Sequence, residues 1–170
     1  MTVRRQMRLQ KREIQDPEIL REILEECDVV RIGARDGQGM FIVPVNYGYE
    51  FDMDAEGTGL TLYIHGAGEG RKADAFAADP AVAVEMDCCH EIITGNYTCS
   101  YSYAYRSIMG NGTIHRLEDP QEKLLGLTKI MNHMAPEAEI EFREEMLQRT
   151  EVFRIDVESF TGKERKRKQP

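Results

Sequence analysis

The spacing of apolar residues changes several times along the chain, and each change marks a predicted helix or strand. After Asp16, an expected N-cap, and Pro17, apolar side chains recur at helical spacing up to Cys27. Further helices are predicted over 71–78, 120–134 and 140–149. Alternating segments predict strands over 29–34, 40–51, 60–65, 81–86, 106–115 and 152–157. The segment 97–105, rich in Tyr, Ser and Thr, suits a strand or a binding loop better than a helix.

Many short strands at hairpin-like spacing, with helices at the ends and in two crossovers, favour a mainly antiparallel β-barrel with peripheral helices. No internal repeat and no low-complexity linker divides the 170 residues, which predicts one domain over 1–170. Residues 1–15 are expected to form an N-terminal arm. The basic segment 164–170 is expected to be a solvated tail.

Composition and charge exclude several classes of protein. The formal net charge of -8 argues against general nucleic-acid binding, which needs a basic surface. No apolar run approaches the roughly 20 residues of a membrane-spanning helix. The basic start lacks the apolar stretch of a secretory signal, so we expect a cytoplasmic protein. The four cysteines and four histidines show no metal-ligand spacing, and no metal site is expected.

The segment LYIHGAGEGRK, residues 62–72, carries the strongest chemical signal in the chain. A predicted strand ends at His65, three glycines follow within five residues, and Arg71 and Lys72 begin a predicted helix. Cations at a helix N-terminus are unfavourable for the helix dipole unless an anion is bound there. A phosphate would meet free N–H groups and two cations together. A plain strand-to-helix turn with solvated cations is the alternative interpretation.

Two further segments could contribute to the same site. Pro44 interrupts a predicted strand, which leaves neighbouring backbone groups of Val43, Val45 and Asn46 free for a flat heterocycle. A simple edge strand or bulge would explain the same pattern. Further along, YAYRSIMGNG offers a cation and a hydroxyl just after tyrosines that alternate along one strand face. Those tyrosines could equally form a cross-strand ladder that supports the sheet.

The segments MRLQKREI, VPVNYGYE, LYIHGAGEGRK, YRSIMGNGTI and SFTGKERK, taken in this order, resemble the FMN-binding split-barrel flavoproteins related to pyridoxamine 5'-phosphate oxidase. The best match is the nitroimidazole-resistance, or 5-nitroimidazole reductase-like, subgroup. The resemblance implies a split β-barrel that forms a homodimer with FMN in clefts between the subunits. It implies the following cofactor-binding residues: Val43, Pro44, Val45, Asn46, His65, Gly66, Ala67, Gly70, Arg71, Lys72, Arg106, Ser107 and Lys163.

The resemblance implies that the protein would be a flavin-dependent oxidoreductase. FMN would take electrons from a reduced nicotinamide and pass them to a small molecule such as a nitroaromatic. His65 is the candidate catalytic residue, because an imidazole can donate a proton near neutral pH. The alternative is a non-catalytic protein that binds flavin, deazaflavin or haem, with His65, His90 or His115 as axial ligand of a haem. The segment 87–100 matches no feature of the family.

Overall fold

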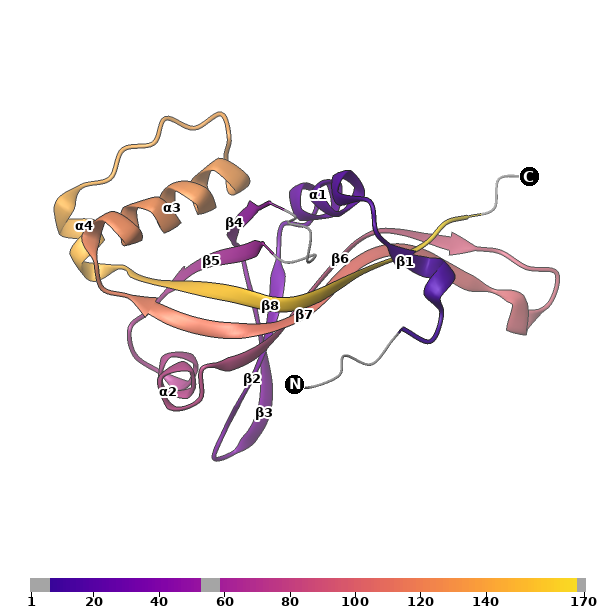
Figure 1. Ribbon diagram of the computed structural model, residues 1–170, viewed down its shortest axis with the longest axis horizontal. Coiled ribbons are helices and arrows are strands. Elements are labelled where there is room, and N and C mark those ends of the chain that lie inside the picture. Colours follow the sequence, from indigo (N-terminus) through magenta and orange to yellow (C-terminus); the bar gives the residue numbers. More distant parts are fainter. Residues whose placement is uncertain (1–6, 53–58, 168–170) are drawn as a thin grey trace.

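The computed structural model describes residues 7–52 and 59–167, and an eight-stranded antiparallel sheet dominates it (Figure 1). The strands are β1 (Glu13–Ile14), β2 (Val30–Asp36), β3 (Gly39–Val45), β4 (Gly48–Phe51), β5 (Leu60–Gly66), β6 (Ala81–Ile93), β7 (Ser102–Leu117) and β8 (Glu151–Arg165). The helices are α1 (Pro17–Glu26), α2 (Arg71–Ala78), α3 (Pro120–Met134) and α4 (Glu144–Arg149), with short 3-10 turns at Gln10–Arg12 and Thr98–Ser100.

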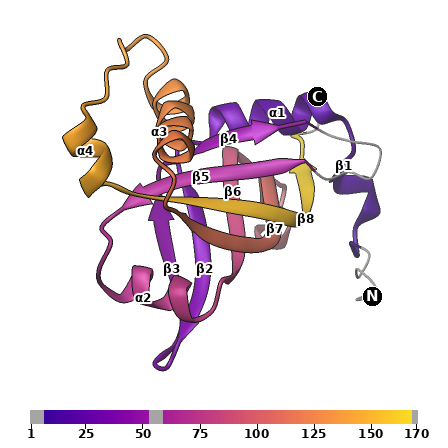
Figure 2. The same cartoon turned by 60° about the vertical axis from the view of Figure 1, so that its left-hand side comes forward.

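The sheet curls into a barrel that is split along one seam. Its strand order is β3-β2-β6-β7-β8-β5-β4, and β1 adds to β8. The two edge strands, β3 and β4, are consecutive in the chain and are joined only by Asn46 and Tyr47. Three Cα–Cα steps lead from Val45 to Gly48 and span about 11 Å at most, so the edges must approach each other at this end. No ladder joins β3 to β4 in the part of the chain that the structure describes. Figure 2 shows β2 and β3 running steeply across β4, β5 and β8. The fold is that of a split β-barrel with peripheral helices.

Helices cover the barrel at two places. The buried stripe of α1 reaches the main core inside the barrel, and the stripe is formed by Leu20, Ile23 and Leu24. Helix α3 lies over the outer face of β4 and β5, where it encloses a second, smaller apolar cluster (Figure 1). The approach of α3 is close, because a Cβ at Gly48 would lie 2.6 Å from the backbone oxygen of Lys129.

Asn46 and Tyr47, the two residues at the seam between β3 and β4, both take part in hydrogen bonds that involve side chains. The Tyr47 side chain is fully buried, and its hydroxyl donates to the backbone oxygen of Leu24, 2.8 Å away. Nδ1 of His133 donates to the Tyr47 backbone oxygen at 2.7 Å. The Asn46 amide nitrogen lies 3.3 Å from the sulfur of Met134. These contacts with α1 and α3 explain why Asn46 and Tyr47 do not pair with a neighbouring strand among the described residues.

The predicted helices are confirmed in most of their length. Those over 71–78 and 120–134 have the observed bounds, and Asp16 caps α1 by accepting from the backbone N–H of Glu18. The helix predicted over 140–149 was too long, since α4 begins only at Glu144. The prediction of one continuous strand over 40–51 was wrong, because the seam divides it.

Other predicted strands were too short. The strand predicted over 81–86 continues to Ile93, and the last strand continues from Val157 to Arg165. Glu164 and Arg165, assigned to a solvated tail, belong to β8. Within the predicted N-terminal arm, Glu13 and Ile14 pair with β8. Residues 1–6 and 168–170 lie outside the described part of the chain. Across the residues described, no helix is long and apolar enough to cross a membrane.

Candidate functional site

The junction between β5 and α2 presents backbone donors at the start of a helix, and we refer to it as the cradle. Strand β5 ends at Gly66, and α2 begins at Arg71. Gly70 precedes the helix with a φ of 100°, a conformation that other residues rarely adopt. No side chain caps the helix, and the first N–H groups of a helix have no partner within it. These donors and the positive end of the helix dipole therefore remain available to an anion.

Lys72 supplies the free cation of this cradle. Its side chain is half-buried, and its ammonium group lies so close to Gly66 that a Cβ there would collide with it. Within the described residues, the ammonium group has no carboxylate within ion-pair distance. Holding a charge partly away from water without a partner costs free energy. The arrangement therefore favours a bound anion at Lys72.

His65 stands at the exposed end of β5, next to Lys72. Partial desolvation and, second, the positive charge of Lys72 lower the pKa of His65 below its ordinary value. A lowered pKa favours the neutral imidazole, which can donate only one N–H. An anion at Lys72 would oppose the effect of the ammonium charge. The expected proton donation by His65 near neutral pH therefore depends on what binds at Lys72.

Arg71 has a different role from Lys72 in this structure. Its Nε lies 2.6 Å from one carboxylate oxygen of Asp36, and a terminal nitrogen lies 3.1 Å from the other. The guanidinium also covers the ring of Phe41, with its central carbon 4.4 Å from the ring centroid. The hydrogen bonds from Arg71 lower the pKa of Asp36. Arg71 thus ties α2 to the β2–β3 hairpin, and the sequence analysis missed Asp36 and Phe41.

The segment 43–46 lies on an edge of the sheet, as the proline suggested. Strand β3 pairs with β2 alone among the described strands, and Pro44 stands opposite Arg31. Pro44 itself is exposed, whereas Val43 and Val45 are half-buried. Edge position leaves some backbone N–H and C=O groups of this segment without ladder partners.

The seam brings the end of this segment to the same part of the barrel as His65. Gly48 is the ladder partner of Tyr63, and β5 runs on from Tyr63 to His65. On the other strand, the chain runs from Gly48 back through Tyr47 to Asn46. The seam and His65 therefore lie at the same end of the β4–β5 pair. One ligand could touch both.

Three predicted cofactor residues lie together but elsewhere. Ser107 is buried on β7 and pairs with Lys163 on β8. The Lys163 ammonium lies 5.8 Å from the ring centroid of Tyr105. Arg106 is paired with Glu22, at 2.7 Å between the side chains. These residues form a second, separate group at one end of β7 and β8.

The two groups are too far apart to share one ligand within a chain. His65 on β5 is the ladder partner of Val152 on β8, and Val152 is also the ladder partner of Leu117 on β7. From Leu117 to Ser107, β7 continues for ten residues, or about 33 Å at the usual strand rise. Figure 1 shows the long run of β7 and β8 beyond α2. The predicted site is therefore divided into two parts.

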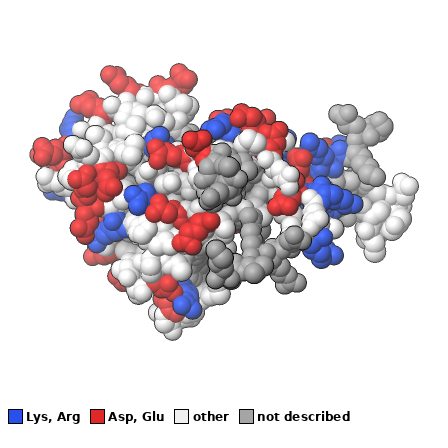
Figure 3. Space-filling model, viewed as in Figure 1, with Lys and Arg blue, Asp and Glu red and all other residues white. Residues whose placement is uncertain are grey.

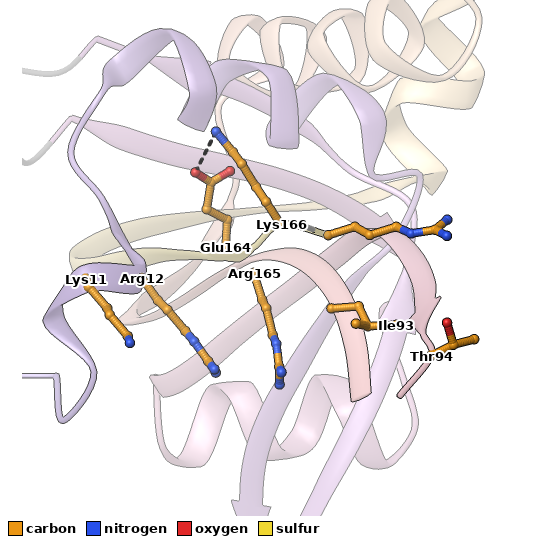
Figure 4. Close-up of a pocket in the computed structure, with 8 residues that line it drawn as sticks. Lys11, Arg12, Ile93, Thr94, Glu164, Arg165 and Lys166 are labelled. Carbon is orange, nitrogen blue, oxygen red and sulfur yellow. Dashed lines mark ion pairs between the residues drawn. The ribbon is translucent and has the colours of Figure 1, made fainter. Parts of the chain in front are cut away.

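A cavity near the second group was not predicted. It has a volume of about 720 Å³ and is lined by Lys11, Arg12, Ile93, Thr94, Glu164, Arg165, Lys166 and Arg167 (Figure 4). The sequence analysis noticed that both ends of the chain are basic, but not that they meet. We refer to this feature as the basic cavity.

Comparisons with known proteins agree with the fold. A family model described as pyridoxamine 5'-phosphate oxidase matches residues 16–164. A proposed 5-nitroimidazole antibiotic resistance protein from Bacteroides thetaiotaomicron has a similar structure, with a TM-score of 0.75 and 28% identity, covering 89% of this chain and 85% of that one. No protein in the search of curated sequences matches the chain.

More distant structures share the fold. A flavocytochrome from Azotobacter vinelandii has a TM-score of 0.75 at 17% identity, covering 95% of this chain and 72% of that one. A FAD-binding protein from Mesorhizobium loti has a TM-score of 0.61 at 19% identity, covering 91% and 98%. With the family model extending over 149 of the 170 residues, the chain belongs to the pyridoxamine 5'-phosphate oxidase-like family.

Proposed function

We propose that the protein binds FMN as a homodimer and acts as a flavin-dependent oxidoreductase on a small acceptor. The observation that carries the proposal is the half-buried Lys72 ammonium beside Gly66 at the start of α2, which has neither an ion-pair partner nor a side-chain cap among the residues that the structure describes. A phosphate dianion would satisfy that charge and the free N–H groups together. The flavin would supply the redox chemistry once bound.

Relatives support a flavin as the class of cofactor. One similar structure is a FAD-binding protein, and another is a flavocytochrome. FMN is our choice within this class, since the cradle offers one free cation beside His65 and suits a terminal phosphate. Backbone groups of Val45 and Asn46, on the open edge next to His65, are the candidates to contact the ring.

The divided site is the main argument for a dimer. Arg106, Ser107 and Lys163 can reach a ligand at Lys72 only if they come from a second copy of the chain. The sheet also leaves apolar side chains uncovered on its outer face, with 69% of Ile42 and 58% of Met109 exposed. Such a patch is typical of a surface that another protein covers.

In the proposed reaction, Lys72 would bind the phosphate and His65 would deliver a proton. Lys72 and the first N–H groups of α2 would hold the phosphate and fix the position of the ring. The bound dianion would then offset the Lys72 charge that lowers the pKa of His65. His65 could therefore hold a proton at its ring nitrogen and deliver it to a substrate near neutral pH.

The substrate class comes from the Bacteroides relative. That protein is described as a proposed 5-nitroimidazole resistance protein, so a nitroaromatic is the proposed acceptor and a reduced nicotinamide the proposed donor. We place the protein in the cytoplasm, a reducing compartment, in keeping with its four free cysteines.

The decisive experiment is an absorption spectrum of the purified protein, followed by mass identification of the released ligand and the mass of the native assembly. Two broad bands in the near-ultraviolet and blue, a ligand with the mass of FMN and a dimer would support the proposal. A colourless protein that takes up no FMN when it is offered in excess would overturn it.

Haem binding without catalysis is the second candidate, and one observation favours it: a similar structure is described as a FAD and haem binding protein from Mycobacterium smegmatis. Of the three histidines considered, His90 lies 2.7 Å from Asp87 and His115 lies 3.2 Å from Asp156. His65 has no side-chain hydrogen-bond or ion-pair partner among the described residues, so it would be the axial ligand. A sharp Soret band that is lost in His65→Ala would support this candidate over the first.

A further inference from the structure

The basic cavity forms where three distant parts of the chain meet. Lys11 and Arg12 come from the short 3-10 turn before β1, and Arg165 ends β8. The pairing of Glu13 on β1 with Lys163 on β8 brings the 3-10 turn and the end of β8 together. The β6 end of the long β6–β7 hairpin supplies the remaining wall.

Three cations in this cavity have no carboxylate partner among the residues of 7–52 and 59–167. In Figure 4 the side chains of Lys11, Arg12 and Arg165 extend in the same direction from neighbouring strands and turns. None of them forms an ion pair with any residue that the structure describes. By contrast, Lys166 is 3.1 Å from Glu164, and Arg167 is paired with Glu91.

The local charge is opposite to that of the whole protein. The lining contains five cations and one carboxylate, and Glu91 at its border neutralises one more, which leaves a net charge of +3. The chain as a whole carries -8. Figure 3 shows Lys and Arg gathered near the hairpin end of the molecule, while acids prevail over the rest of this face. A concentrated positive field of this kind attracts multiply charged anions.

The chemistry of the cations indicates adjacent phosphates. A guanidinium presents a planar fork of donors that matches phosphate oxygens, and two such forks stand beside a lysine here. A volume of about 720 Å³ lies within the usual range for small-molecule sites. Ile93 and the aliphatic stems of the cations add apolar contact area for a non-phosphate part of the ligand.

A second cavity, on the side of Arg106, shares part of the wall of the basic cavity. This smaller cavity of about 150 Å³ is lined by Arg106 and Tyr105, and the shared wall runs from Glu164 to Arg167. Arg106 belongs to the group that the proposed dimer brings to the flavin. A ligand anchored in the basic cavity would therefore lie beside the proposed redox site.

We propose that the basic cavity binds a pyrophosphate group, namely that of the dinucleotide that delivers electrons to the flavin. Lys11, Arg12 and Arg165 hold the two phosphates, and the nicotinamide half extends along the wall towards Arg106. Binding of pyrophosphate depends only on the cavity, whereas the assignment to the electron donor rests on the proposed function.

The first test is calorimetric titration of the protein, as purified, with inorganic pyrophosphate at low salt. The double variant Lys11→Gln/Arg165→Gln should bind at least about tenfold more weakly, because two charge-assisted contacts are lost. The matched control is Arg143→Gln/Arg149→Gln, which removes two exposed charges near α4 and should bind like the wild type. Equal affinity in all three proteins, or no binding at all, would overturn the site.

The second test assigns the ligand and uses the FMN-loaded protein. The KM for NADH should rise at least about tenfold in the double variant, with kcat and the dissociation constant of FMN unchanged. If pyrophosphate binds at the cavity but the KM for NADH is unaffected, the donor assignment is wrong. If the wild-type protein does not bind FMN, the proposed function is refuted. The pyrophosphate titration would still test whether the basic cavity binds an anion.

Discussion

Replacing Lys72 by Met tests the phosphate cradle directly. Methionine keeps much of the length and apolar area of the lysine stem but removes the charge over Gly66. At an effective dielectric constant of 20, two unit charges 4 Å apart attract by about 4 kcal/mol. Lys72 is only half-buried, so water recovers part of this interaction. We expect FMN binding to weaken by about 2 kcal/mol, or roughly 30-fold.

The assay is fluorescence titration of FMN and, in parallel, of riboflavin, which has the same ring without the phosphate. Affinity for riboflavin should be nearly unchanged in Lys72→Met, so the preference for FMN over riboflavin should fall. Removing the ammonium should also raise the pKa of His65 in the ligand-free protein, measured by NMR titration, since the Lys72 charge now lowers it. An unchanged ratio of the two affinities would show that the phosphate binds elsewhere.

Three further changes test other parts of the structure. His65→Gln should keep FMN but lose most turnover. The pKa of His65 is lowered in the folded state, so the free energy of unfolding of the wild type falls as the pH drops from about 6.5 towards the folded-state pKa. In thermal melts over this pH range, the melting temperature of His65→Gln should therefore fall less than that of the wild type. Gly48→Ala should destabilise the fold by at least about 2 kcal/mol, since its methyl group meets the backbone of α3, whereas Gly37→Ala, with open space around it, should melt like the wild type. Ile42→Asp should yield monomers in light scattering while Met146→Asp, on the similarly exposed surface of α4, should not; dimers in both variants would exclude the outer sheet face as the interface.

The strand, glycine turn and helix of 62–72 could be predicted from sequence because all their parts are local. A strand end, glycines and two cations follow one another within 62–72, and α2 has the predicted bounds. The distinct roles of the two cations could not be predicted. Arg71 is occupied by Asp36, which is 35 residues away and comes close only through the β2–β3 hairpin.

The misjudged boundaries have tertiary causes. The break at Asn46–Tyr47 follows from hydrogen bonds to α1 and α3, which no local pattern reveals. The strand predicted over 81–86 was too short: burial still alternates up to Cys88, and residues 89–92 beyond it are all exposed, so no alternating pattern marks the far part of β6. The basic cavity was missed because its walls are about 150 residues apart in the sequence.

The open edge of β3 has a consequence for handling and for the cell. An uncovered strand edge with exposed apolar side chains, here Met40 and Ile42, invites the same edge of another molecule to add to it. Pro44 interrupts the row of donors and partly blocks that growth. If the proposed dimer forms, single subunits released by dilution should therefore precipitate more readily than dimers, and a cofactor that stabilises the dimer would protect the protein against aggregation.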